Sequence, residues 1–313
     1  TPLVPGGRLR DRGPPAWPHP PACAAWADAC IEPRAAGRRP TSRRVVRLLG
    51  PALQRQGWPA APAPPAGSIL RHMASEPASL RIARELARRL AALDWRTPSH
   101  VYNPLDYAWS GHRQYLLRYG RQRGRVLLLG MNPGPWGMAQ TGVPFGNVAV
   151  VRDWLHIETR LAGELPEQHP KYPILGMRCH RNEGSGQRLW AWAQERFATP
   201  DAFFERFFIW NYCPLLFLGA GRNLIPGSLD RRERDALDAA CAPALRRVLR
   251  ALQPAAVVGI GRYAEARAQE LAGEGTRIVY LPHPSPASPA ANRDWPSMAD
   301  RALAPWLPGR ERR

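Results

Sequence analysis

Short apolar runs and longer amphipathic stretches follow one another along the chain from residue 73 onward. Four runs bounded by turn residues are typical of strands buried on both faces, and they cover 126–130, 207–211, 255–260 and 278–281. Apolar residues recur at helical spacing over 80–93, 189–197, 230–252 and 263–271. Parallel strands need crossover connections, which helices usually supply. The order therefore predicts an α/β fold in which helices cover both faces of a parallel sheet of four strands.

The first 66 residues have a different composition, with 14 of the 35 prolines, ten arginines and only three acidic residues. Such a composition is typical of disordered chain. Met73 opens a typical helix start, with Ser75 or Ser79 as its N-cap. We therefore expect a disordered, Arg- and Pro-rich segment over 1–72 and one folded domain over 73–313. Two interpretations of the first segment stay open: a basic arm that adds affinity for DNA, and sequence upstream of a native start at Met73.

The net charge indicates which class of molecule the protein binds. Lysine and arginine total 44 against 25 acidic residues, which gives +19 at neutral pH. Nucleic acid is the commonest partner for such an excess, because neutralised phosphates release their counterions. The apolar runs are far shorter than the roughly 18 residues of a membrane-spanning helix, so we expect no membrane partner.

The cysteines and histidines argue against a bound metal. The five cysteines are odd in number, widely spaced and without a C-x-x-C pair, which argues against a disulfide scaffold, a zinc ribbon or a cysteine-ligated iron–sulfur cluster. His156, His169 and His180 also lack the spacing of metal ligands. We expect no metal and no cofactor, and a reducing, intracellular setting.

Polar groups follow three of the predicted strands, where a parallel sheet places its ligand site. The first strand leads into 130–146, which holds five glycines and three prolines, with Asn132 near its start and Phe145 near its end. Asn211 ends the second strand, and His283 follows the fourth. Neither the dinucleotide fingerprint nor the P-loop pattern is present. Two amides, an imidazole and an aromatic ring suit a flat, uncharged heterocycle.

These stretches resemble one family closely. GMNPGPWGMAQTGVPFG at 130–146, NYCPLLFL at 211–218 and HPSPASPAAN at 283–292 are similar to the single-strand-selective monofunctional uracil-DNA glycosylases, the third family of the uracil-DNA glycosylase superfamily. The resemblance extends from about residue 95 to residue 307. It implies a three-layer α/β/α sandwich with a central parallel sheet of four strands. It also implies an enzyme that hydrolyses the N-glycosidic bond of uracil and 5-hydroxymethyluracil in DNA and leaves an abasic site.

The resemblance assigns roles to residues that match its motifs. Asn132 is expected to orient the attacking water and His283 to support the departing base. Phe145 is expected to stack on the flipped base, Asn211 to read its edge, and Gly134 to face a substituent on C5. The pocket is expected to include Met131 and Met138 as well. The expected DNA contacts are Arg178, Ser185, Pro284, Ser285, Pro286, Ala287, Asn292 and Arg293. The vertebrate members of the family carry a basic residue where Ala287 stands.

The chemistry of base removal fits this set. The departing uracil gains negative charge on O2, which a histidine N–H stabilises whether or not the ring is charged. An asparagine pairs with uracil N3–H and O4, and cytosine presents these groups reversed. No carboxylate lies between Tyr107 and Arg152, so the first motif lacks a strong base. Lys171 is the only lysine, which argues against a lyase step through a Schiff base.

Two other functions stay open: a glycosylase for deaminated purines (xanthine or hypoxanthine) on the same scaffold, and a DNA-binding relative without catalysis. The expected partner is uracil-containing DNA, single- or double-stranded, and the expected state is a monomer. The setting would be the nucleus of a eukaryote, or the cytoplasm and nucleoid of a bacterium.

Overall fold

The computed structural model describes residues 76–289 and 291–308, and all of these belong to one compact unit. The expectations for 1–72, and Ser75 as an N-cap, lie outside the described residues. Within that part of the chain, no helix is both long and apolar enough to cross a membrane.

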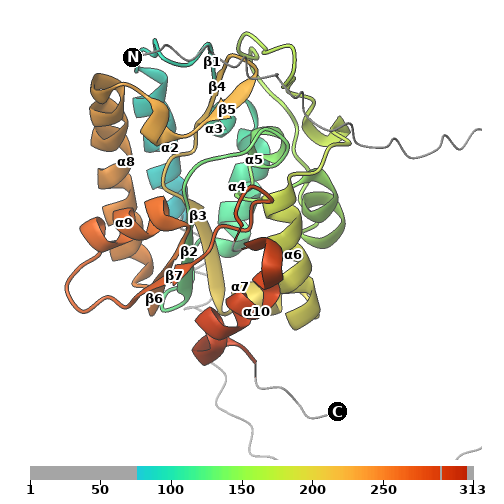
Figure 1. Ribbon diagram of the computed structural model, residues 1–313, viewed down its shortest axis with the longest axis vertical. Helices are drawn as coiled ribbons and strands as arrows, with labels where there is room; N and C mark the ends of the chain where they lie inside the picture. Colours follow the sequence, from blue (N-terminus) through green and yellow to red (C-terminus); the bar gives the residue numbers. More distant parts are fainter. Residues whose placement is uncertain (1–75, 290, 309–313) are drawn as a thin grey trace, which may run out of the picture. The chain divides into compact units, whose positions relative to one another are not determined.

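A parallel sheet of four strands forms the centre of the fold, as predicted (Figure 1). The order β3-β2-β6-β7 places the strand from the first motif beside the strand that ends in Asn211. All three neighbouring pairs are parallel. The strand bounds agree with the apolar runs to within one residue: β2 Val126–Gly130, β3 Phe207–Asn211, β6 Ala256–Ile260 and β7 Ile278–Leu281.

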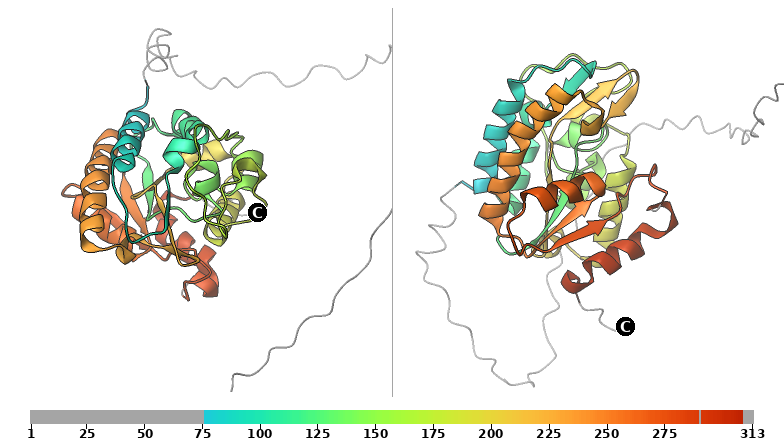
Figure 2. Two further views of the ribbon diagram at one scale, coloured as in Figure 1. Left: turned by 90° about the horizontal axis from the view of Figure 1, so that it is seen from above. Right: turned by 60° about the vertical axis from the view of Figure 1, so that its left-hand side comes forward.

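Helices cover both faces of this sheet. In Figure 1, α2, α8 and α9 lie on the left of the strands, and α6 and α10 lie on the right. Helices α2 and α8 run side by side, which Figure 2 shows from a second direction. The longer helices are α2 Ala78–Ala91, α4 Trp109–Tyr119, α6 Gly184–Arg196, α8 Arg231–Leu252, α9 Arg262–Leu271 and α10 Ala291–Leu303, and the shorter ones are α3 Pro104–Tyr107, α5 Met138–Thr141 and α7 Pro200–Phe204.

The apolar spacing located four of these helices, although α6 begins five residues earlier than the pattern indicated. Its first turn is Gly-Ser-Gly, which carries no apolar residue to signal a helix. The expected N-cap of α2 is wrong. Pro77 occupies that position, and Ser79 lies inside the helix, where its buried hydroxyl donates to the carbonyl of Gly120 at 2.9 Å.

A second, antiparallel sheet was not predicted. It joins β1 His100–Tyr102, β4 Leu216–Gly219 and β5 Arg222–Leu224 in the order β1-β4-β5. These strands have three or four residues each, and β1 pairs with a strand more than 100 residues away, so local spacing carries little signal. The β4–β5 hairpin extends the chain that follows Asn211 and returns it toward the same end of the parallel sheet.

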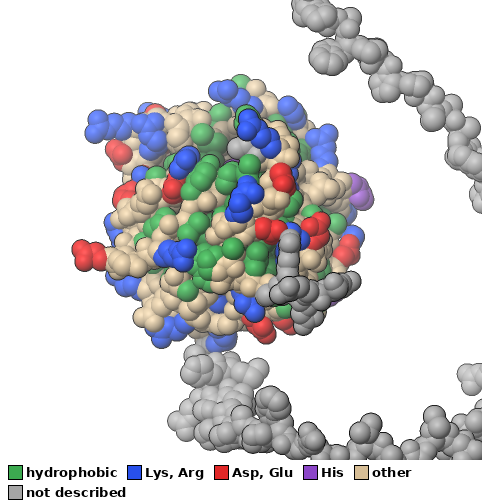
Figure 3. All heavy atoms as spheres, turned by 60° about the horizontal axis from the view of Figure 1, so that its bottom comes forward, with side chains coloured by type: hydrophobic (Ala, Val, Ile, Leu, Met, Phe, Trp, Pro, Cys, Tyr) green, Lys and Arg blue, Asp and Glu red, His purple; other side chains and the backbone are tan. Residues whose placement is uncertain are grey.

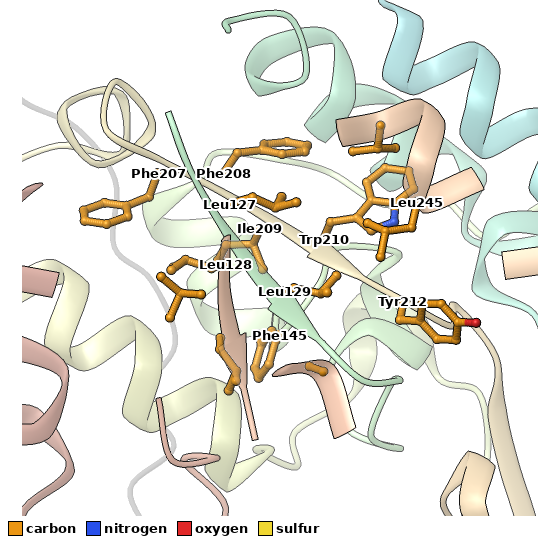
Figure 4. Close-up of a cluster of buried hydrophobic side chains, with 14 of the residues drawn as sticks. Leu127, Leu128, Leu129, Phe145, Phe207, Phe208, Ile209, Trp210, Tyr212 and Leu245 are labelled. Carbon is orange, nitrogen blue, oxygen red and sulfur yellow. The ribbon is translucent and has the colours of Figure 1, made fainter. Parts of the chain in front are cut away.

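Aromatic side chains fill the core on both faces of β3. Phe207 packs on Phe203 on one face, while Phe208 stacks on Tyr115 on the other. Trp190 and Trp192 of α6 are fully buried. Figure 4 shows this cluster, with Phe145 among the side chains around β2. The residue that the sequence assigned to base stacking is thus anchored in the main core.

The N-terminus of α8 is fixed by a buried carboxylate. Asp230 and Glu233 form a capping box, and the Glu233 carboxylate also accepts hydrogen bonds from the backbone of Arg96 and Thr97. Burial raises the pKa of Glu233, but the hydrogen bonds that it accepts outweigh burial and leave this pKa below its usual value. A carboxyl with a lowered pKa stabilises the fold above its unfolded pKa.

We expect Glu233→Gln to lower the free energy of unfolding at pH 7 by about 1–3 kcal/mol, because one charged acceptor serves several backbone donors. The difference from the unmutated protein should shrink as the pH falls below 4.5, the ordinary value for this group. Urea denaturation at several pH values measures this difference in the free energy of unfolding. Asp235→Asn, an exposed carboxylate two residues further along, is the control. An equal loss in both variants would contradict the assignment.

Candidate active site

A cavity of about 390 Å³ opens where β2 and β3 end and where the chain leaves β7. The seven residues expected to form the catalytic and substrate-binding pocket all line it: Met131, Asn132, Gly134, Met138, Phe145, Asn211 and His283. They come from segments up to 152 residues apart in sequence (Met131 to His283), and the parallel sheet brings them together.

The loop after β2 holds the amide of Asn132 in one orientation. The backbone N–H of Cys213 donates to the carbonyl of Met131 at 2.9 Å, so the loops after β2 and β3 are joined. The Asn132 nitrogen Nδ2 donates to the carbonyls of Leu215 at 3.3 Å and Pro133 at 3.4 Å. Because the nitrogen is used by the protein, the oxygen Oδ1 is the atom that remains to accept a hydrogen bond from water or substrate.

Asn211 presents a buried acceptor that the protein does not satisfy. Its nitrogen lies 3.3 Å from the sulfur of Met138, while Oδ1 is buried and has no hydrogen-bond partner among the described residues. Gly130 makes this arrangement possible, since a Cβ there would lie 2.2 Å from Oδ1 and 2.7 Å from the ring of Phe145. Buried acceptors in native proteins are nearly always paired, so this oxygen calls for a donor from a ligand.

Phe145 has a strained backbone that the core holds in place. Its φ is +57°, a conformation that is unfavourable for a bulky residue. Its carbonyl accepts a hydrogen bond from the indole of Trp190 at 3.1 Å, and it lies so close to Gly186 that a Cβ there would be 2.1 Å away. The ring lies 6.1 Å from that of His283, at 38°. The result is a fixed aromatic wall for the cavity.

His283 is held as a neutral donor. The backbone N–H of Ser285 donates to Nδ1 at 3.2 Å, which assigns the ring proton to Nε2. The indole of Trp295 donates to the preceding carbonyl of Pro282 at 2.7 Å and fixes the start of this loop. Burial lowers the pKa of His283 to about 4, so the ring is uncharged at neutral pH.

Glu183 is a pocket residue that sequence reasoning missed. It precedes α6, lines the cavity, and its carboxyl oxygen Oε2 is buried without a partner among the described residues. Burial raises its pKa to about 7, while a hydrogen bond from the backbone of Gly137 acts in the opposite direction. A Cβ at Gly134 would lie 2.3 Å from Oε2, so the space in front of this glycine holds the Glu183 carboxyl.

The structure divides the expected DNA contacts into two groups. Ser185, Ser285 and Pro286 line the cavity. The other five do not line it: Arg178, Pro284, Ala287, Asn292 and Arg293. Trp136, Asn182, Asn223 and Ile225 also line the cavity, and sequence reasoning assigned none of them. Asn223 lies on β5 and Ile225 follows it, so these two reach the cavity through the unpredicted hairpin.

The loop after His283 is held by hydrogen bonds within it and from α6. The side chain of Asn292 donates to the carbonyl of Pro286 at 2.6 Å. Arg188 of α6 donates to the side chain of Asn292 and to the carbonyl of Ala291. Pro286 and Ala287 are exposed at the tip. Asn292 therefore shapes this loop, which makes an indirect contribution to any contact that the tip makes.

Among the described residues, no group of three or more His, Cys, Asp or Glu side chains is arranged to hold a metal ion. The three cysteines in that part of the chain are free and buried.

The family model described as the uracil DNA glycosylase superfamily matches residues 117–304. The chain belongs to the uracil DNA glycosylase superfamily. Within this superfamily, it is 44% identical over 256 residues to the single-strand selective monofunctional uracil-DNA glycosylase of Rattus norvegicus, with 79% of this chain and 92% of the rat protein covered. It therefore belongs with these family members, as its motifs indicated.

One further relative agrees with this glycosylase family, and one solved structure agrees with the fold. The single-strand selective monofunctional uracil DNA glycosylase of Mus musculus is 47% identical over 207 residues, covering 65% of this chain and 74% of the mouse protein. The crystal structure of wild-type Pedobacter heparinus SMUG2 aligns with this chain at a TM-score of 0.50 and a sequence identity of 18%. The alignment covers 72% of this chain and 96% of that one. The latter supports the fold alone.

The tautomer of His283 leads to a prediction about its titration. We expect the imidazole signals of His283 to stay those of a neutral, Nε2-protonated ring from pH 8 down to about pH 5, because burial lowers its pKa to about 4. Heteronuclear NMR of histidine-labelled protein measures this. The same residue in urea, with its ordinary pKa of 6.5, is the reference. A midpoint near 6.5 in the folded protein would contradict the assignment.

Proposed function

We propose that this chain is a monofunctional DNA glycosylase that hydrolyses the N-glycosidic bond of uracil and leaves an abasic site. The observation that carries the proposal is the pair of polar atoms in the cavity wall: the unpartnered acceptor of Asn211 and the neutral N–H donor of His283. Uracil offers a donor at N3–H and an acceptor at O2, next to each other on one edge. The names of the relatives support the same reaction.

Leaving-group stabilisation is the larger part of the mechanism. As the bond to the sugar lengthens, the base gains negative charge on O2 and the sugar gains positive charge. The Nε2–H of His283 donates to O2, and its strength in a dry cavity exceeds that in water. Because its lowered pKa leaves the imidazole uncharged, the ring has no imidazolium proton to transfer to the departing base, and its remaining N–H is a very weak acid that stays on the ring. Negative charge therefore accumulates on uracil, which departs as an anion.

Asn132 acts on the water. Its Nδ2 is committed to backbone carbonyls, and its Oδ1 accepts a hydrogen bond from a water molecule directed at the sugar carbon. An amide takes no proton at neutral pH, so it orients this water without activating it as a base. Such assistance is sufficient when the sugar cation forms before the water attacks.

Asn211 selects uracil over cytosine. Its Oδ1 accepts from uracil N3–H, and its nitrogen, whose contact in the protein is the weak acceptor sulfur of Met138, donates to O4. Cytosine has an acceptor at N3 and a donor at C4, so both contacts would be lost. Each buried polar group left unpaired costs about 1–3 kcal/mol.

A lyase step is not part of the proposal. Lys171 is the only lysine of the sequence, its amine donates to the carbonyl of Gly221 at 3.0 Å, and it does not line the cavity. The reaction is therefore hydrolytic, with no Schiff base to the sugar.

The DNA strand is proposed to bind across the cavity rim in single- or double-stranded form. Basic side chains are spread over the face shown in Figure 3 among apolar and acidic ones. The excess of basic residues in the sequence suits contacts with phosphates along a strand. Pro286 and Ala287 are exposed at the loop tip, and we propose that this tip enters a duplex while Arg293 contacts a phosphate. 5-Hydroxymethyluracil is the proposed second substrate. A monomer acting in the nucleus or nucleoid completes the proposal.

We expect Asn132→Ala and His283→Ala each to reduce single-turnover excision of uracil by about 10²-fold or more, because each removes an interaction that acts on the reacting groups. The assay uses a uracil-containing oligonucleotide with alkali cleavage of the product. His180→Ala, which changes an exposed histidine outside the cavity, is the control. If both variants excised uracil at the rate of the unmutated protein, these roles would be refuted. Competing oligonucleotides with xanthine or hypoxanthine would reveal a purine preference.

A further inference from the structure

Two grooves share Arg250, which lies in the last turn of α8. One, of about 370 Å³, lies between α8 and the start of α2. The other, of about 490 Å³, lies between α8, the end of α9 and the loop that precedes β7. The carbonyl of Leu252, at the end of α8, accepts a hydrogen bond from the backbone of Gly124, which precedes β2. Because the catalytic cavity lies where β2 ends, the two grooves lie at the opposite end of the sheet.

Every charged residue among the described ones that line either groove is an arginine. The first groove has Arg81 and Arg247, the second has Arg246, and both have Arg250. Arg247 pairs with Glu85 where α2 and α8 run side by side (Figure 2). The exposed guanidinium groups of the other three make neither a hydrogen bond nor an ion pair with a described residue.

The three unpaired arginines create a local excess of positive charge. Arg246 and Arg250 are four residues apart in α8, so they lie on one face about 6 Å apart along the helix axis, and like charges at this spacing repel each other. Arg81 lies near the start of α2, where the helix dipole disfavours a cation. That start has no side-chain cap and no acidic residue in its first turn. An anion bound at these positions would relieve both unfavourable interactions.

The second groove combines an apolar floor with uncharged polar side chains. Leu249 and Leu271 line it and are almost fully buried, and Pro254 lines it as well. Gln253 and Thr276 also line this groove, and their side chains make no hydrogen bond to a described residue. A few polar groups around an apolar floor are typical of a site that binds an apolar group and orients it.

We propose that the two grooves form a docking surface for an acidic peptide segment of a partner protein. Carboxylates about 6 Å apart pair with Arg246 and Arg250, a spacing that residues i and i+4 of a helix or i and i+2 of an extended chain provide. An apolar side chain of the same peptide packs on Leu249 and Leu271. The proposal does not depend on the excision of uracil, and it leaves the catalytic cavity open while the partner is bound.

The chemistry of the grooves favours a peptide over a nucleic acid strand. The phosphates of a strand would pair with the arginines, but unpaired bases bind by stacking on aromatic side chains. None of the described residues that line either groove is aromatic. An acidic peptide offers carboxylates, which arginine binds through two parallel hydrogen bonds, together with an aliphatic side chain for the floor.

Fluorescence anisotropy of the full chain tests the proposal. The probe is a fluorescein-labelled peptide that repeats Glu-Glu-Leu-Asp, in about 0.15 M salt to screen distant charges. We expect the double variant Arg246→Gln/Arg250→Gln to weaken binding by about tenfold or more, because it removes both charged donors. A peptide with serine in place of leucine should bind the unmutated protein about fivefold more weakly, because it loses the apolar contact.

The control is the double variant Arg88→Gln/Arg113→Gln, which removes the same charge from exposed arginines outside both grooves and should change the affinity by less than about twofold. Equal weakening in the two double variants would reduce the binding to general attraction and overturn the proposal. Absence of peptide binding would overturn it as well. If a uracil-free oligonucleotide displaced the peptide and lost affinity in Arg246→Gln/Arg250→Gln to the same extent, the surface would belong to nucleic acid and the proposal would be wrong.

Discussion

The pairing of Gly130 with Asn211 at the ends of β2 and β3 is the constraint on which the rest of the site depends. The parallel register puts these residues side by side, and the missing side chain of Gly130 is filled by the Asn211 amide oxygen and the Phe145 ring. A methyl group at this one position would displace both. The same register carries the loop with Asn132 over the loop after β3, where backbone hydrogen bonds join them.

Around this pair, hydrogen bonds from neighbouring residues fix several groups of the cavity wall. Backbone carbonyls hold the nitrogen of Asn132, the N–H of Ser285 sets the tautomer of His283, and the indole of Trp190 holds the strained carbonyl of Phe145. The atoms left for the ligand are therefore oriented in advance. Preorganised donors and acceptors need no rearrangement as charge develops, which is the main source of electrostatic catalysis.

Burial gives the two ionisable groups of the cavity opposite shifts. The pKa of His283 falls to about 4 and that of Glu183 rises to about 7, because a buried site disfavours the charged form of either group. In the proposed reaction, the histidine remains a neutral donor beside the departing base. The carboxyl, which directly precedes α6, adds an acceptor to a pocket whose principal motif contains no acidic residue.

Local sequence determined the central sheet and indicated the position of the site. Apolar runs of strand length located the four parallel strands, and the unusual 130–146 segment with Asn211 and His283 indicated the site, because such signals are contained within a few residues. Other features depend on non-local contacts, and only the tertiary structure revealed them. They are the pairing of β1 with β4, the cavity residues Asn223 and Ile225, and the orientation of Glu183. A carboxylate before a Gly-Ser-Gly helix start resembles an ordinary helix cap in sequence. Its position depends on the glycines of a loop about 50 residues away, which pack against it only in the folded chain.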